Sequence, residues 1–315
     1  MKKYIIISFF AISLVVVSLV FILLKPTPTI KLTTIKKAYS YVSCFHDEEK
    51  MQVSILINNR DSAITNEKKC SSAAIADKNN HNEILLGLED ITYNNKQYKI
   101  NDETFYQYTF AFQIPLKTDE KFLLEIENAY LCLNYDNVDV KIEIGSFSFY
   151  KVPYLGDEKA YLTISKLKPI VNEFQNEKTL VALVIGTSNQ TKEAITITRV
   201  VPLDLNMQFS AQDILTLEKE LFPNSNISTL LGKNYTISSS NLVNDEVTLM
   251  IPANTTVNYL FPIKYNGELK TNKVGFLIEY TVGSEARTLY YDEFLFFTTT
   301  ENSPVDLDVL TYENR

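Results

Sequence analysis

Starting at Val138 and ending at Tyr150, the chain reads VDVKIEIGSFSFY. Apolar residues alternate with polar ones, so that Val138, Val140, Ile142 and Ile144 share one face. A period of two is typical of a strand whose sheet packs on one face and meets water on the other. This segment therefore predicts an antiparallel β-sheet.

Similar runs occur on both sides of this segment. They begin at Met51, Tyr106, Phe122, Leu180, Ala194, Glu246, Thr256, Val274 and Thr288. The chain has only 8 glycines, and asparagines, which tolerate left-handed turns, occupy many of the breaks between runs. Short strands between turn signals favour sandwiches over alternating strand–helix units. We therefore expect an all-β body with tandem antiparallel β-sandwich domains.

The runs form two series that resemble one another, a weak internal repeat. The run MQVSILINNRDSAIT from Met51 parallels LVALVIGTSNQTKEAIT from Leu180. A strand, polar turn and strand from Tyr108 likewise parallel those from Tyr259. The repeat predicts two domains, 38–155 and 156–300. The strand pattern resembles the broad immunoglobulin-like architecture, although the chain has no Trp and so lacks the Cys-Trp-Cys core signature.

An apolar run starts at Tyr4 and ends at Leu24 without a charge, Gly or Pro. At about 1.5 Å per helical residue it is long enough for the roughly 30 Å hydrocarbon core of a bilayer. A cleaved signal peptide is the alternative, but its apolar core is usually about 7 to 15 residues long. We expect an uncleaved transmembrane helix at 4–24, preceded by a cytoplasmic segment at 1–3 and followed by a basic linker at 25–37.

The charges flanking this run do not fix its orientation. Lys2 and Lys3 precede it, and four lysines follow within the predicted linker, so the positive-inside rule gives no decision. A short positive segment before an apolar run is how export signals begin, which favours a cytoplasmic N-terminus and an extracytoplasmic body. The formal net charge of -8 argues against nucleic acid as a partner, because phosphate binding needs a basic face.

Two segments outside the strand pattern have their own predictions. Residues 210–221 read SAQDILTLEKEL, with Ser210 placed as an N-cap, Asp213 three residues later, and Pro223 as a stop. Ile214 and Leu217 fall on one helical face, so we expect a helical insertion at about 210–222. Its position suggests a cover over one end of the sandwich or a binding surface. Residues 301–315 are expected to form a polar tail.

The cysteines and histidines are the first candidates for chemistry. Cys44 and His46 are two residues apart and could share a strand face as metal ligands or as nucleophile and base. The one further histidine is His81, which is too few for a tetrahedral metal site. Outside the cytosol, Cys44 and Cys70 could instead form a disulfide. Cys132, within AYLCL, is expected to be a buried, inert thiol.

A weak calcium site is the remaining candidate. Asn134, Asp136 and Asp139 offer oxygen ligands, but they lie where a hairpin turn is expected and turn chemistry also explains them. The chain has no P-loop and no Gly-x-Ser-x-Gly motif. We therefore predict no catalytic residue and no cofactor.

Together these features predict a membrane-anchored, extracytoplasmic binding or adhesion-type protein without catalytic activity. Its partners would be the lipid bilayer, through residues 4–24, and a protein or glycan ligand at loops or strand edges. An accessory subunit of an envelope transport or secretion complex is one alternative. An enzyme with a site around Cys44 and His46 is the other.

Overall fold

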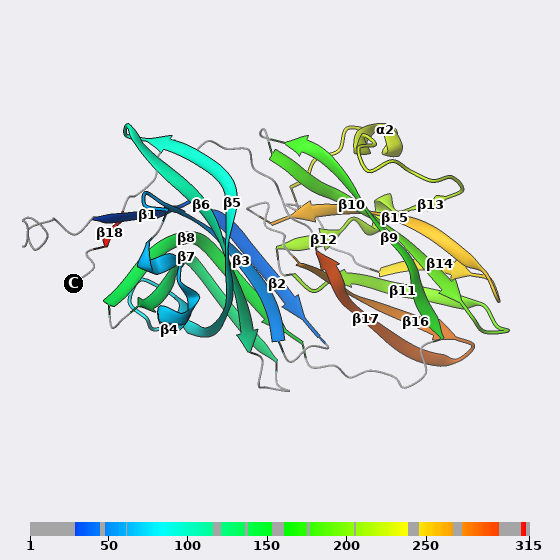
Figure 1. Cartoon of the computed structure of the whole chain (residues 1–315). Helices are drawn as coiled ribbons and strands as arrows, with labels where there is room; N and C mark the ends of the chain where they lie inside the picture. The colour runs from blue at the N-terminus through cyan, green and yellow to red at the C-terminus, as the bar shows by residue number, and fades with distance from the viewer. Residues whose placement is uncertain are drawn as a thin grey trace, which may run out of the picture.

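The computed structural model describes residues 29–44, 48–60, 62–115, 121–135, 138–152, 161–174, 177–204, 206–238, 246–266, 273–295 and 310–312. These residues are nearly all β, arranged in several sheets (Figure 1). The predicted transmembrane helix at 4–24 and the segment at 1–3 lie outside the described residues. Within the ranges that are described, no helix has the length and hydropathy needed to cross a membrane.

The N-terminal strands form two layers that share one bent strand. The first layer runs in the order β1 (Ile30–Thr34), β3 (Glu48–Ile57), β6 (Glu103–Pro115) and β5 (Glu83–Ile100). The second continues from β5 through β4 (Cys70–Ala76), β7 (Phe122–Tyr135) and β8 (Val138–Lys151) to β2 (Lys37–Ser43). The start of β5 pairs with β4 and the rest pairs with β6, so β5 closes one side of this N-terminal sandwich.

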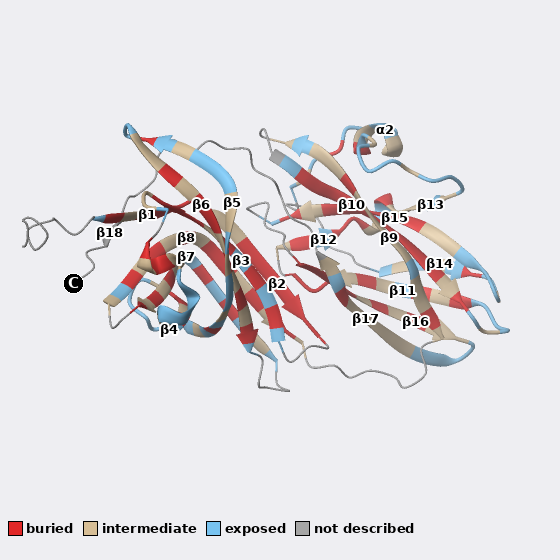
Figure 2. Ribbon diagram, in the orientation of Figure 1, coloured by how far each residue is buried: buried red, intermediate tan, exposed pale blue. Residues whose placement is uncertain are grey.

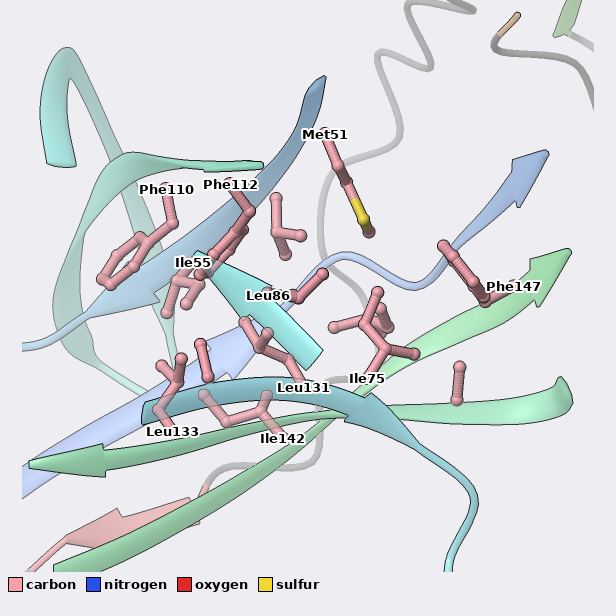
Figure 3. Close-up of a cluster of buried hydrophobic side chains, with 14 of the residues drawn as sticks. Met51, Ile55, Ile75, Leu86, Phe110, Phe112, Leu131, Leu133, Ile142 and Phe147 are labelled. Carbon is pink, nitrogen blue, oxygen red and sulfur yellow. The ribbon is translucent and has the colours of Figure 1, made fainter. Parts of the chain in front are cut away.

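The core of this sandwich lies between its two layers. As the alternation predicts, β8 buries Val140, Ile142 and Ile144 there. Figure 3 shows that side chains from both layers fill the same space, and among them are Ile55, Phe110, Phe112, Leu131, Leu133 and Ile142. Figure 2 shows buried residues, in red, along the strands of both layers. Burying one such side chain contributes about 1.5–3 kcal/mol, so this core holds the layers together.

The strands from β9 onward form two further sheets. One contains β9 (Leu162–Phe174), β10 (Glu177–Asn189) and β15 (Thr256–Tyr265), with β12 (Met207–Phe209) and β13 (Leu215–Leu217) on β15. The other contains β14 (Glu246–Ile251), β11 (Ile195–Pro202), β16 (Lys273–Val282) and β17 (Glu285–Leu295). A second core, which includes Phe261 and Phe276, lies between them. We call this pair of sheets the C-terminal sandwich.

The two sandwiches repeat one pairing scheme, which agrees with the resemblance between the two series of runs. β1, β3 and β6 are neighbours in the same order as β9, β10 and β15. β4, β7 and β8 correspond in the same way to β11, β16 and β17. β2 departs from the scheme, because it pairs with β8 in parallel and no described strand of the C-terminal sandwich occupies the matching position. The predicted division at 155/156 falls in 153–160, outside the described residues.

Two predictions about the chain ends are wrong. Part of the segment predicted as a linker, 25–37, forms β1, whose Ile30 and Leu32 are buried in the core. Part of the predicted tail, 301–315, forms β18 (Leu310–Tyr312), which pairs antiparallel with β1. Both errors have the same cause: each short segment is ordered by a strand distant in the sequence, so its own composition does not reveal it.

The predicted helix at 210–222 is also wrong. Ala211–Asp213 is a single 3₁₀ turn, and Leu215–Leu217 then pairs with β15 as strand β13. The hydroxyl of Ser210 donates to the carboxylate of Asp213 at 2.7 Å and makes no cap bond to a backbone N–H. The described α-helix in this region is α2 (Ile227–Leu231), which begins after an Asn226 cap and ends at Gly232 in the left-handed conformation.

The segment that contains β13 and α2 covers the outer face of the sheet formed by β9, β10 and β15. Ile227 and Tyr235 pack there against Val181, Val184 and Leu260. β10 is therefore buried on both faces, which explains why its run LVALVI is continuously apolar. The predicted cover over one end of the sandwich is therefore wrong, because the segment that contains β13 and α2 lies on a sheet face.

Asp213 fastens this cover and gives a first testable prediction. It is 6% exposed. Burial alone would raise the pKa of Asp213, but hydrogen bonds from Lys233 and Ser210 hold it below its ordinary value. At neutral pH, Asp213→Asn should lower the free energy of unfolding by about 1–3 kcal/mol. Because the folded pKa is depressed, the stabilisation exists above the ordinary carboxyl pKa of about 4 and is lost as the pH falls through the folded pKa.

Urea unfolding of both proteins at neutral and acid pH measures this effect. The difference between wild type and Asp213→Asn should shrink on acidification. Glu220→Gln is the control, because the Glu220 side chain also pairs with lysine but is 73% exposed, and it should leave stability essentially unchanged. A difference for Asp213→Asn that does not depend on pH would contradict the role assigned to its charge.

Candidate functional site

The strand that departs from the repeat, β2, also joins the two sandwiches. Its Tyr39 and Tyr41 point into the N-terminal core, whereas Ser40 and Val42 on the opposite face meet the C-terminal sandwich. Val42 and the following Cys44 pack with Leu203, and partly buried Tyr150, Val152, Leu277 and Tyr290 surround them. We call this contact, together with the charged residues described below, the junction.

A glycine allows the close approach of the two sandwiches. A Cβ atom on Gly275 of β16 would lie 2.9 Å from Val42 Cγ1 and 3.1 Å from the carbonyl oxygen of Tyr291. The backbone N–H of Leu203 donates to the carbonyl of Gly275 at 2.9 Å. Glycine at this position therefore permits direct packing of β16 against β2.

The pairing of β16 with β17 brings two charged side chains to the junction. Along β16, Val274 and Phe276 enter the C-terminal core, so Lys273 and Gly275 face outward. A register shift between Val274 and Phe276 places an extra residue in β17. Asp292 lies in this bulge and is fully buried. Lys273 and Asp292 consequently project to the same side from neighbouring strands.

These two side chains meet a third from the N-terminal sandwich. Lys273 Nζ forms an ion pair with the Glu49 carboxylate of β3 and lies 3.8 Å from Asp292 Oδ2. The backbone N–H of Cys44 donates to the same Asp292 oxygen at 2.6 Å. Glu49, Lys273 and Asp292 are 7%, 4% and 0% exposed, and the neighbouring Lys151 is 5% exposed. Charges this deeply buried are tolerated only when they are paired and hydrogen-bonded.

The electrostatics of the junction weigh against Cys44 as a nucleophile. Burial, and next the nearby negative charge of Asp292, raise the pKa of the Cys44 thiol to about 12, although Lys273 and Lys151 oppose this shift. The thiolate is the nucleophilic form of cysteine. At neutral pH Cys44 is therefore held as an unreactive thiol.

The histidines do not complete a site with Cys44. His46 lies outside the described residues, and His81 is exposed in the loop after β4. The last residue of β4 pairs with Tyr130 of β7. The last residue of β2 pairs with Lys151, and Lys151 in turn pairs with Phe122 of β7. Eight residues of extended strand separate those two levels by roughly 25 Å. His81 therefore cannot act as a base for Cys44.

The predicted disulfide pair is not brought together either. All three thiols are free. Through β7, Cys70 lies level with the first residue of β8. Cys44 directly follows the last residue of β2, which pairs with Lys151 at the other end of β8. The length of β8 separates the two levels by roughly 40 Å, well beyond the ~7 Å Cα limit of a disulfide. Cys132 is only half-buried on the outer face of β7, contrary to its expected burial, and burial raises the pKa of its thiol.

Two residues of the predicted calcium site can be placed. Asn134 and Asp139 are directly opposite across the β7–β8 hairpin, and the Asn134 amide donates to the Asp139 carboxylate at 2.7 Å. The Asn134 oxygen accepts from the Ser71 hydroxyl at 2.6 Å. Asp136 lies outside the described residues, so the calcium site stays a prediction. Across the described part of the chain, no group of three or more His, Cys, Asp or Glu residues is suited to a metal ion.

An open groove of about 580 Å³ lies on the outer face of the C-terminal sandwich, over β11, β14 and β16. Arg199 Nη1 donates to Glu279 Oε1 at 3.3 Å within it. The groove is lined by Thr198, Arg199, Glu246, Val247, Thr248 and Glu279. Charged and hydroxyl groups of this kind can hydrogen-bond a polar ligand, so the groove is a candidate contact surface.

Glu49, Lys273 and Asp292 do not stand out as a site in the sequence. A signal existed in the second half, where Asp292 interrupts the aromatic run YYDEFLFF. A charge inside an otherwise apolar strand often marks a buried, paired group. Its partners could not be identified, because Glu49 and Lys273 are 224 residues apart in the sequence.

Comparisons with known proteins do not assign the chain to a family. No protein-family model and no curated protein matches it. Among solved structures, the C-terminal domain of the Streptococcus agalactiae AgI/II polypeptide BspA aligns at 10% identity and a TM-score of 0.20, over 84% of this chain and 99% of that chain. The C-terminal domain of the Streptococcus pyogenes antigen I/II-family protein AspA aligns at 8% identity and a TM-score of 0.20, over 84% and 98%. A protein of unknown function from Porphyromonas gingivalis aligns at 9% identity and the same TM-score, over 83% and 98%. TM-scores of this size do not establish a common fold.

Proposed function

We propose that this chain is a membrane-anchored, extracytoplasmic binding protein of the adhesion type, whose two sandwiches form one rigid body that contacts a protein or glycan. The observation that carries the proposal is the junction. It joins the sandwiches through apolar packing, buried ion pairs and backbone hydrogen bonds at the same place. A rigid body presents its loops and grooves in fixed positions, which lowers the entropic cost of binding.

An immunoglobulin-like assignment of both sandwiches belongs to this proposal. In that architecture, strands A, B, E and D form one sheet and strands C, F and G form the other. β1, β3, β6 and the later part of β5 have the neighbours expected of A, B, E and D, and β4, β7 and β8 those of C, F and G. Proteins with this architecture commonly bind through the loops and faces of rigid sheets.

The anchor rests on the uncharged run from Tyr4 to Leu24. Its length suits a bilayer, and the first strand of the body begins soon after it, at Ile30. The body would therefore stand close to the membrane surface. A cytoplasmic segment at 1–3 and an extracytoplasmic body follow from the export-like N-terminus.

The contact surface that we propose is the groove over β11, β14 and β16. Its Arg199 and Glu279 offer donors and acceptors to a polar ligand, and the register shift between Ile197 and Arg199 of β11 places Arg199 opposite Glu279 of β16. The raised pKa of Cys44 and its distance from His81 weigh against catalysis at the alternative site. Binding is therefore the function that these groups support best.

The test uses the full-length chain in lipid nanodiscs, applied to a glycan array and a panel of extracellular matrix proteins. We expect saturable binding that Arg199→Ala with Glu279→Ala weakens by about tenfold or more, as for central contact residues. Lys264→Ala, on another sheet, is the control and should bind as wild type does. Failure to bind anything on either panel, or equal binding by both variants, would contradict this proposal.

Membrane placement is tested separately by fractionation of the expressing cells. The full-length chain should stay with membranes after an alkaline wash and enter solution only with detergent. A full-length chain that is recovered in the soluble fraction would overturn the anchor without affecting the binding result.

A further inference from the structure

We propose that Lys273 and Asp292 become joined by an intramolecular isopeptide bond, an amide between the two side chains, with Glu49 carrying the protons. This covalent link between β16 and β17 goes beyond the proposed binding function. The bond would hold two strands of the junction together and does not involve the ligand groove. The proposed bond can therefore be disproved without affecting the ligand-binding experiment.

The Lys273 amine and the Asp292 carboxyl group are held close enough to react. Lys273 and Asp292 project to the same side from neighbouring strands, and Lys273 Nζ lies 3.8 Å from Asp292 Oδ2. Fixing a nucleophile beside its target removes most of the entropic cost of an amide-forming reaction. The amine is thus placed next to the carboxyl carbon that it would attack.

A hydrogen-bond donor lies where charge would develop. The backbone N–H of Cys44 donates to Asp292 Oδ2 at 2.6 Å. When the amine adds to the carboxyl carbon, negative charge moves onto such an oxygen, and a fixed donor there stabilises it. β2, the strand that departs from the repeat, leads directly to this N–H.

Glu49 is placed to move protons. Its carboxylate pairs with Lys273 Nζ from the opposite side of the junction. An ammonium group has no lone pair, so it must lose a proton before it can attack. A buried carboxylate in direct contact with Nζ is a suitable acceptor, and the same group can deliver protons to the departing oxygen.

The reaction balances without any further reagent. The Lys273 ammonium gives a proton to Glu49, and the neutral amine then forms a bond from Nζ to Cγ of Asp292. Glu49 delivers that proton and a second one from Nζ to the carboxylate oxygen that Cys44 does not hold. The C–O bond breaks, one water molecule leaves, and Glu49 returns to its starting state. One ammonium and one carboxylate become one neutral amide and one water.

Burial favours this product. Lys273 and Asp292 are 4% and 0% exposed, and amide formation replaces two buried charges, which are costly in a protein interior, by a neutral group. Expulsion of water also opposes the reverse reaction, hydrolysis. A second lysine–aspartate pair among the described residues, Lys233 with Asp213, lacks this feature because the Lys233 side chain is 53% exposed.

Mass spectrometry of the purified full-length chain tests the bond. The wild-type protein should be lighter than its sequence by the mass of one water molecule, and a tryptic digest should contain one branched peptide that joins the segments around 273 and 292. Lys273→Met and Asp292→Ala should each restore the full sequence mass. Glu49→Gln, which keeps the size and polarity of the side chain, should also restore it while the strand content measured by circular dichroism is unchanged.

Lys151→Met is the matched control, because Lys151 is a lysine of the same junction with similar burial, and this variant should retain the mass deficit. A folded wild-type chain with its full sequence mass and no branched peptide would overturn the proposal. A deficit that persists in Lys273→Met would overturn it as well.

Discussion

Replacing Gly145 with alanine should lower the free energy of unfolding by roughly 3–5 kcal/mol. Gly145 has a φ of +110°, which L-residues rarely adopt, and a Cβ atom there would lie 2.1 Å from the carbonyl oxygen of Lys37 and 2.7 Å from its nitrogen. Those are backbone atoms at the start of β2, so the contact cannot be relieved by a side-chain rotation. The whole strand must move away from β8.

Urea unfolding followed by circular dichroism measures this loss. The matched control is Gly87→Ala, because a Cβ on Gly87 would have no neighbour nearer than 3.8 Å, and its effect should stay below about 1 kcal/mol. Equal stability of the two variants would show that β2 does not approach β8 as described. Since β2 also forms the junction, only Gly145→Ala should disturb both sandwiches.

Lys273→Met should cost about 3–5 kcal/mol, because it removes the lysine that lies between Glu49 and Asp292 and leaves both carboxylates buried without it. Methionine keeps much of the length and apolar contact of lysine, so the loss reports on the polar and covalent partners of Lys273 and not on its packing. The same urea unfolding experiment measures it.

Lys264→Met is the control for that substitution. Lys264 Nζ lies 5.8 Å from the ring centre of Tyr235, and losing such a cation–π contact should cost at most about 1 kcal/mol. If Lys273→Met were as stable as Lys264→Met, the partners of Lys273 at the junction would contribute little to stability.

The strands were predictable because their pattern is local. The alternation after Val138 reports directly on which residues enter the core, and the resemblance of the two series corresponds to a repeated pairing scheme. β1 and β13 were missed for the opposite reason. Pairing with a distant strand orders each of them, and for Leu215–Leu217 pairing with β15 overrides a local helix signal.

The junction could not be predicted from the sequence, for a related reason. Its chemistry depends on a parallel pairing of β2, a bulge in β17 and a contact between residues 224 positions apart. In the sequence, Cys44 was a candidate because His46 lies two residues away and because Cys70 could pair with it. The structure shows Cys44 contributing its backbone N–H to Asp292 while its thiol is buried and unreactive.

Hydrogen exchange at the Cys44 amide tests most directly whether the two sandwiches form one body, because that N–H donates across the junction to Asp292. This amide should exchange as slowly as the core amides of β3 and β16, and Lys273→Met should accelerate it. Exchange at the rate of an exposed amide, while β3 and β16 remain protected, would show that the two sandwiches separate freely and do not form one body.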